Sequence, residues 1–235
     1  MKKSNQDQSI RRMVMIGMFT AIAYVAMLVI HIKVGFLTMD VKDAMITICG
    51  LFFGPVAALF VSVVVPVLEL FTVSSTGVYG LIMNILGSVS FSVTVALFYK
   101  WKKTLWGALA GLAAGVLSMT AVMMLANLFI TPYYMGTTMA AVRSMIPTLL
   151  LPFNLLKGVI NAGVVLLLYK PLSRALRRAR LLPMAAEKTV ENSPHYATKS
   201  AKIVSICVTL AAILLIAASV ALIFTVMGGK FTFGA

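Results

Sequence analysis

The chain has 235 residues, of which 61% are hydrophobic, and its mean hydropathy is +1.01. Soluble domains contain about 45–50% apolar residues, so this composition excludes an ordinary soluble domain. The net charge of +14 does not indicate a nucleic-acid binder, because 15 of the 20 Lys and Arg residues fall in three clusters beside hydrophobic runs: Lys2–Arg12, Lys100–Lys103 and Lys170–Lys202. That pattern is typical of the cytoplasmic loops of membrane proteins, and the sequence predicts an all-α polytopic membrane protein.

The first expected helix runs from about Arg12 to His31, with its basic end in the cytoplasm, and a short external loop follows it. The next apolar stretch could form one long helix or two short ones. Gly54-Pro55 favours two, because a proline disfavours helix at the residue before it, and a break there also keeps every basic cluster on one side of the membrane. The resulting second helix, about Val41 to Phe53, is shorter than the ~30 Å hydrocarbon core. We therefore expect it to span only partly or to pack within protein.

Four longer helices are expected next: one ending near Leu70–Phe71, then Tyr79–Tyr99, Leu105–Ile130 and Ile146–Leu172. The stretch TPYYMGTTMAAVRS, between the last two, is expected to be an external loop. A polar linker, 181–202, would join the six-helix domain, 1–180, to an additional transmembrane helix, 203–228. This arrangement places the N-terminus in the cytoplasm and the C-terminus outside.

Several polar side chains lie within or beside the predicted spans and need a reason to be there. Asn154, Lys157 and Asn161 are spaced i, i+3 and i+7, so they share one helix face. A lysine at mid-depth costs about 2.5–3.5 kcal/mol on insertion scales, so Lys157 must meet a water-filled cavity, a partner or a ligand. A structural ion pair between Glu69 and Lys157 is the main alternative. Further polar residues are expected around the same outward-facing mouth: Thr38, Asp40, Asp43, Asn84 and Asn127.

Amide and ammonium groups of this kind suit a polar, planar ligand, since they offer several donors and acceptors. Aromatic side chains could form the walls of such a pocket, although each alone is more readily explained by the core or by the membrane interface: Phe36, Tyr133, Tyr134 and Phe153. The small residues Gly17 and Ala21 allow close helix approach, and they form either a packing surface or a docking face for another membrane protein.

No catalytic constellation is evident. The chain has no G-x-x-x-x-G-K-[ST] phosphate loop, no H-E-x-x-H and no G-x-S-x-G, and its six acidic residues are scattered. We therefore expect neither an enzyme nor a metal site.

Four stretches, in this order, resemble the substrate-binding (S) components of energy-coupling factor (ECF) vitamin transporters, specifically the riboflavin-binding type: FLTMDVKDAMITICGLFFGP, SSTGVYGLIMN, ANLFITPYYMG and LPFNLLKGVINAGVVLLLYKPL. The resemblance covers about residues 10 to 175. It implies a six-helix fold in the cell membrane that captures riboflavin from outside for ATP-driven uptake. Riboflavin would be the transported ligand, with no separate cofactor. The implied partners are a membrane scaffold subunit and two ATP-binding subunits, which would carry out the ATP hydrolysis.

The family's binding residues correspond to Asn127, Asn154 and Lys157, and the loop around Leu37–Asp40 is expected to cover the pocket. The resemblance also matches Gly17 and Ala21 to the scaffold-docking surface, although Val25 interrupts the longer small-residue pattern. It assigns no role to the helix at 203–228. Three alternatives stay open: an S component for another small nutrient, a structural membrane protein that transports nothing, and an intramembrane enzyme.

Overall fold

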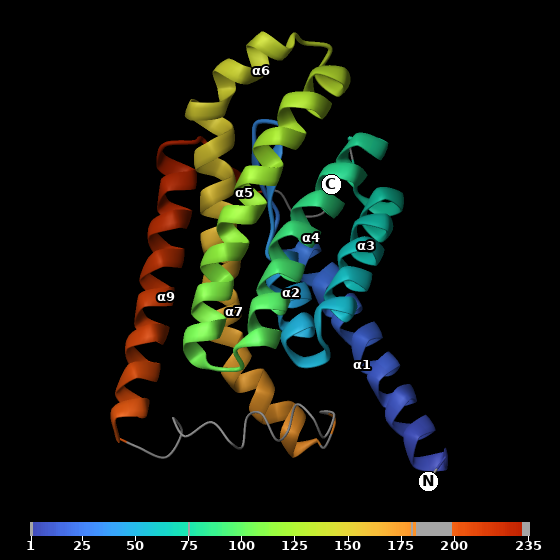
Figure 1. The fold of residues 1–235 in the computed structure, drawn as a ribbon. Helices are drawn as coiled ribbons and strands as arrows, with labels where there is room; N and C mark the ends of the chain where they lie inside the picture. Colours follow the sequence, from blue (N-terminus) through green and yellow to red (C-terminus); the bar gives the residue numbers. More distant parts are fainter. Residues whose placement is uncertain (1, 75, 180, 182–198, 232–235) are drawn as a thin grey trace.

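The computed structural model describes residues 2–74, 76–179, 181 and 199–231, and within them the chain is a bundle of helices (Figure 1). Six described helical stretches are long and apolar enough to cross a membrane. The helices, with one π-helical segment η1, are α1 (Lys2–Val29), α2 (Lys42–Phe53), α3 (Pro55–Thr72), α4 (Gly77–Trp101), α5 (Leu105–Met135), α6 (Met139–Met145), η1 (Ile146–Leu150), α7 (Leu151–Arg178) and α9 (Lys199–Thr225).

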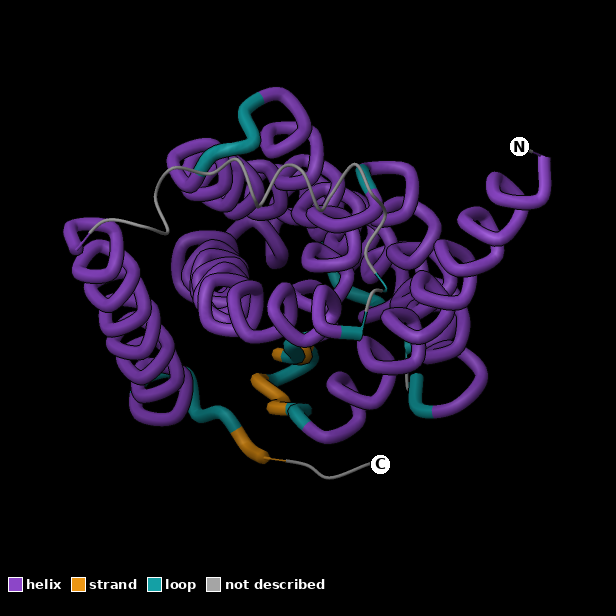
Figure 2. Tube along the Cα trace, turned by 90° about the horizontal axis from the view of Figure 1, so that it is seen from below, coloured by secondary structure: helices purple, strands orange, loops and turns teal. Residues whose placement is uncertain are grey.

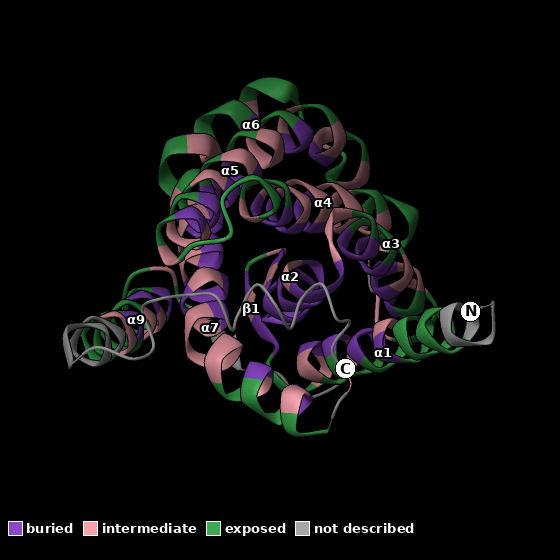
Figure 3. Ribbon diagram, turned by 60° about the horizontal axis from the view of Figure 1, so that its bottom comes forward, coloured by how far each residue is buried: buried purple, intermediate pink, exposed green. Residues whose placement is uncertain are grey.

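The short helix α2 lies in the middle of the bundle, with the longer helices around it (Figure 3). Each of its 12 residues except Leu51 is buried. The break after it falls at Gly54, whose φ of 92° favours glycine, and Pro55 begins α3. The predicted break and the packing of α2 within protein are therefore both confirmed.

A small antiparallel sheet lies at the edge of the bundle, towards the end at which α2 begins (Figure 2). Strands β1 (Ile32–Val34) and β2 (Leu37–Met39) form a hairpin between α1 and α2, and β3 (Lys230–Phe231) adds to the other edge of β1 (Figure 2). We call this the hairpin end. The opposite, basic end carries Arg12, Lys100 and Lys103 around the α2–α3 turn. The sheet was not foreseen, since three-residue strands leave little periodicity in a sequence.

Helices α4 and α5 pack closely through glycines on α5. A Cβ added at Gly115 would lie 2.6 Å from Val95 Cγ2, and one at Gly111 would lie 3.1 Å from Phe98 Cβ. These glycines of α5 are thus part of the internal packing, because close contacts between membrane helices require small residues.

The predicted external loop after Ile130 is largely helical, which corrects the expectation. Helix α5 runs through Pro132 to Met135 and ends at Gly136, whose φ of 60° is left-handed. A short α6 then leads through η1 directly into α7. Pro132 lies inside α5 and does not end it, and prolines are generally tolerated within membrane helices.

The additional C-terminal helix is present as α9, which lies beside α7 (Figure 1). It begins at Lys199, within the predicted linker of 181–202. Residues 182–198 of that linker lie outside the described residues. Ala212 and Ser219 are buried where α9 packs, whereas Leu214 is 70% exposed, so one face of α9 meets the bundle.

Candidate functional site

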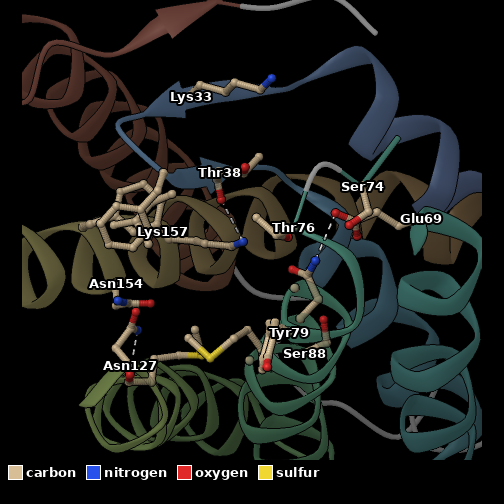
Figure 4. A pocket seen from close by; sticks show the side chains of 18 of the residues that line it. Lys33, Thr38, Glu69, Ser74, Thr76, Tyr79, Ser88, Asn127, Asn154 and Lys157 are labelled. Carbon is tan, nitrogen blue, oxygen red and sulfur yellow. Dashed lines mark hydrogen bonds between the residues drawn. The ribbon is translucent and has the colours of Figure 1, made fainter. Parts of the chain in front are cut away.

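A cavity of about 320 Å³ lies at the hairpin end, between the hairpin and helices α3, α4, α5 and α7. This volume is within the range of small-molecule pockets, about 300–1,000 Å³. Figure 4 shows Lys157, Asn154 and Asn127 on one side of it and Glu69, Ser88 and Tyr79 on the other. The cavity is therefore walled by several elements that are distant in sequence.

Lys157 projects from α7 and is only 9% exposed. Its Nζ donates to the carbonyl oxygen of Thr38, at 3.2 Å, and forms an ion pair with Asp40 Oδ2, at 2.9 Å. Thus the partner of Lys157 is Asp40 of the hairpin connection, and the alternative pairing with Glu69 is wrong. Among the residues that the structure describes, these are the two acceptors of Lys157 Nζ. Because Lys157 also lines the cavity, its third N–H can be donated to a ligand.

A second buried lysine, Lys42, was missed by the sequence analysis. It is fully buried at the start of α2, and its Nζ donates to three side-chain oxygens: Asp40 Oδ2 at 3.2 Å, Glu69 Oε2 at 2.8 Å and Asn84 Oδ1 at 3.1 Å. Asn84 Nδ2 in turn donates to Glu69 Oε1, at 3.0 Å. These contacts join α2, α3 and α4 behind the cavity.

The signal for Lys42 was present in the sequence. The segment DVKD carries three charges immediately before a strongly apolar helix, and a buried ammonium needs acidic partners close by. The sequence analysis instead began the second helix at about Val41 and placed Asp40 and Asp43 around an outward-facing mouth, where charged residues need no partner. In the structure, Asp40, Lys42 and Asp43 are all buried, which the prediction of Asp40 and Asp43 near the mouth did not foresee.

Asp40 lies in the connection between β2 and α2 and is almost fully buried. Burial alone would raise the pKa of its carboxyl group. The ammonium groups of Lys157 and Lys42 outweigh that effect and hold the pKa of Asp40 below its usual range. Asp40 therefore remains ionised and ties the hairpin connection to both lysines.

Asn127 and Asn154 face each other from α5 and α7 across one side of the cavity (Figure 4). Each donates from Nδ2 to the backbone carbonyl four residues earlier in the chain, at 2.8 Å: Asn127 to Met123, and Asn154 to Leu150. Asn127 Oδ1 accepts from Thr131 Oγ1 at 2.9 Å. Within the described part of the chain, Asn154 Oδ1 accepts from no protein donor. Both amides therefore keep hydrogen-bonding capacity directed at the cavity.

Asn161 has a different role, although it shares a face of α7 with Asn154 and Lys157. It is fully buried, does not line the cavity, and accepts from the backbone N–H of Ala44, at 2.8 Å. Its Nδ2 donates to the carbonyl oxygens of Asp40 and Lys157, each at 3.0 Å. Asn161 thus fixes the start of α2 against α7.

The other predicted site residues divide between the cavity and its surroundings. Leu37, Thr38 and Asn84 line the cavity, and Asp40 lies beneath its wall as the partner of the two lysines. Tyr133, in contrast, is 77% exposed and does not line the cavity. Its neighbour Tyr134 does, because successive residues on a helix point about 100° apart.

The aromatic wall is therefore formed by Phe36, Tyr79, Tyr134 and Phe153. The ring of Tyr134 lies 6.0 Å from that of Phe36 and 6.4 Å from that of Tyr79. Together with the two amides and Lys157, these rings give a pocket that combines aromatic walls with convergent polar groups, as small-molecule sites do.

Gly17 and Ala21 lie on the outward face of α1, and both are exposed. A Cβ added at Gly17 would meet nothing within 4 Å. Among the described residues nothing packs closely on Gly17, and the assignment of Gly17 and Ala21 to a docking face stays a prediction.

Comparisons with known proteins point to one family. A sequence model described as "ECF transporter, substrate-specific component" matches residues 11–169. The riboflavin transporter RibU of Staphylococcus aureus (strain TCH60) is 30% identical over 186 residues, which cover 75% of this chain and 97% of that protein. The riboflavin transporter FmnP of Bacillus subtilis (strain 168) is 26% identical over 183 residues, covering 73% and 96% respectively.

A solved structure, described as "Structure and mechanism of the S component of a bacterial ECF transporter", matches with a TM-score of 0.62 and 29% sequence identity. The match covers 98% of that chain but 72% of this one. About a quarter of the present chain therefore has no counterpart in that structure, and α9 lies beyond the residues that the family model matches.

Proposed function

The chain belongs to the ECF transporter substrate-specific component family, and we propose that it binds riboflavin in the cavity at the hairpin end. A member of this family is the substrate-binding part of a multi-pass membrane transporter and not an enzyme. The observation that carries the choice of ligand is the meeting of Lys157, Asn154 and Asn127 at one side of an aromatic-walled cavity. Two relatives that match over most of their length are riboflavin transporters.

The chemistry of the cavity supports a flavin. The ring system of riboflavin is flat and apolar on its faces and carries carbonyl and N–H groups on one edge. Phe36, Tyr134 and Phe153 would enclose the faces. The Lys157 ammonium and the two asparagine amides would bind the polar edge, because together they offer both donors and acceptors.

We further propose that the hairpin end faces the outside of the cell and the basic end the cytoplasm, since Lys and Arg are enriched in cytoplasmic loops. The N-terminus would then lie in the cytoplasm and the C-terminus outside. Uptake would depend on a membrane scaffold subunit, docking at Gly17 and Ala21, and on two ATP-binding subunits. The ligand would be released inside when those subunits reorient the loaded protein.

The test is riboflavin titration of the detergent-purified protein by flavin fluorescence, comparing the unaltered chain with Lys157→Met. Loss of a charged hydrogen bond costs about 1.5–3 kcal/mol, so we expect the dissociation constant to rise about ten- to hundred-fold. Lys102→Met is the matched control, because Lys102 is exposed at the basic end. Unchanged affinity in Lys157→Met would refute the assignment of the pocket, and binding of another vitamin in preference to riboflavin would refute the choice of ligand.

A further inference from the structure

The end of the described chain returns to the hairpin that walls the cavity. Helix α9 runs beside α7 and is followed by β3, which pairs antiparallel with β1. The register places Lys33 opposite Lys230 and Ile32 opposite Phe231. Strand β1 therefore lies between β2 and β3, and the segment 199–231 contacts the hairpin by main-chain hydrogen bonds.

The contact is supported by apolar packing below the sheet. Ile223, near the end of α9, is completely buried in one cluster with Ile32, Val34, Leu37 and Phe153. The turn after α9 is equally close, because a Cβ added at Gly229 would lie 2.7 Å from Ile223 Cγ2 and 3.3 Å from Ile32 Cγ2. The turn itself needs Gly228, whose φ is 64°.

Earlier along α9, a similarly close contact occurs with α7, the helix that carries Lys157. A Cβ added at Gly163 of α7 would lie 2.7 Å from Ile216 Cγ1, and Ala212 is 1% exposed. Helix α9 is thus fixed against α7 at Gly163 and against the hairpin at Ile223. It therefore contacts two elements that line the cavity, α7 and the β1–β2 hairpin.

The hairpin is a part of the cavity wall that could be displaced. Lys33, Gly35, Phe36, Leu37 and Thr38 all line the cavity. Figure 4 shows this segment along one side of the pocket, with Thr38 close to Lys157. Two strands of three residues are marginal on their own, and a two-stranded hairpin gains independent stability only from a third strand or from packing against a helix. Here β3 supplies the strand and α9 part of the packing.

We propose that α9 and β3 form an intramolecular strap that holds the β1–β2 hairpin closed over the cavity and thereby slows ligand entry and release. Ile223 is a positioning residue in this arrangement, since it acts on the ligand only through the hairpin. The inference rests on the proposed binding of riboflavin in the cavity. It adds a function for a helix that the family match does not include.

The first experiment locks the strap by a reversible crosslink in the full chain. Directly opposed residues of antiparallel strands have Cα atoms about 4.5–5.5 Å apart, which suits a disulfide. The variant is Lys33→Cys/Lys230→Cys with Cys207→Ser, because Cys207 is an exposed free thiol. We expect riboflavin to dissociate about ten-fold more slowly from the oxidised protein, since affinity changes act mainly through the dissociation rate, and the original rate to return on reduction.

The controls for the crosslink are the single variant Lys33→Cys with Cys207→Ser and the reduced double variant, each assayed in the same detergent. Failure of the disulfide to form within one chain would overturn the pairing of β1 with β3. A disulfide that forms and leaves the dissociation rate unchanged would overturn the strap as a control on ligand exchange.

The second experiment loosens the strap. In Ile223→Ala we expect faster dissociation of riboflavin and faster amide hydrogen exchange at residues 32–39, whereas Leu214→Ala, on the exposed face of α9, should leave both unchanged. The exchange measurement is made without ligand. If the unaltered protein does not bind riboflavin, the proposed function fails, yet the exchange of the hairpin still decides on the strap. Equal exchange in the two variants would overturn it.

Discussion

Two groups of buried polar side chains lie within reach of each other at the hairpin end, and they are satisfied in opposite ways. Lys42, with Asp40, Glu69 and Asn84, forms a network in which the protein supplies the partners. Asn127 and Asn154 each donate to the backbone carbonyl four residues earlier, and both side chains line the cavity, where they can meet a ligand. Lys157 belongs to both groups, since it binds Asp40 and also lines the cavity.

The difference indicates that the first group holds the helices in place, whereas the second group is placed to bind the ligand. A buried ammonium that already has three oxygen acceptors gains little from a ligand, but it holds α2, α3 and α4 in place. An amide that leaves an acceptor at a cavity surface costs little in an empty, hydrated pocket and becomes valuable when a ligand supplies the donor. Substitutions in the first group should therefore change stability, and substitutions in the second should change binding.

The largest effect is expected at Lys42. Lys42→Met leaves Asp40, Glu69 and Asn84 without their common donor, and breaking a buried ion pair on one side costs about 3–5 kcal/mol. We expect a much lower unfolding temperature in detergent, measured by tryptophan fluorescence or a thiol-reactive dye. Lys102→Met, at an exposed position, is the control. A variant with unchanged unfolding would remove the distinction between the two groups.

The next effect concerns Asn161, which connects α7 to the start of α2. Asn161→Ala removes the shorter of the two acceptors of the buried Ala44 N–H, which keeps only its 3.2 Å bond to the carbonyl oxygen of Val41. It also removes the donor to the carbonyl oxygens of Asp40 and Lys157, so we expect a total cost of about 1–3 kcal/mol. We expect a lower unfolding temperature and, at a temperature where the variant stays folded, nearly unchanged affinity for riboflavin. A large loss of affinity with normal stability would instead place Asn161 among the binding residues.

Asn154 lies on the same face of α7 as Asn161, but its substitution should lower affinity and not stability. Asn154→Ala removes a hydrogen-bonding group that lines the cavity, and a neutral hydrogen bond is worth about 0.5–1.5 kcal/mol. We expect riboflavin affinity to fall about three- to ten-fold while the unfolding temperature of the unliganded protein changes little. Titration and thermal unfolding of the two asparagine variants side by side give the sharpest test of the comparison.

These two asparagines also mark how far the sequence could predict the site. Their spacing and the cost of a charge in the membrane correctly placed Asn154, Lys157 and Asn161 on one buried face. Spacing along one helix could not tell which of them faces the cavity, because that depends on where α2 and the hairpin pack. The same limit applies in part to Lys42: its partner Asp40 is two residues away in the chain, but Glu69 and Asn84 come from two other helices.

The helices themselves were predictable where long uncharged runs and Gly54-Pro55 set their bounds. Prediction from the sequence was wrong at the hairpin end. There the three-stranded sheet and the continuation of α5 through Pro132 depend on contacts between distant segments. A strand of two residues, such as β3, has no signal of its own. It exists because α9 brings it to the edge of β1.

The smallest predicted effect separates two adjacent tyrosines that the sequence could not distinguish. Tyr134→Leu keeps an apolar side chain in the cavity but removes the aromatic contacts with Phe36 and Tyr79, which are worth about 0.5–1.5 kcal/mol for a ring pair. Only part of this loss should appear in the free energy of riboflavin binding, so we expect riboflavin to bind about two- to five-fold more weakly. Tyr133→Leu is the control, because its side chain points away from the cavity and is largely exposed. If Tyr133→Leu weakened binding and Tyr134→Leu did not, the orientation of the end of α5 would be wrong, and with it the aromatic wall that encloses the proposed ligand.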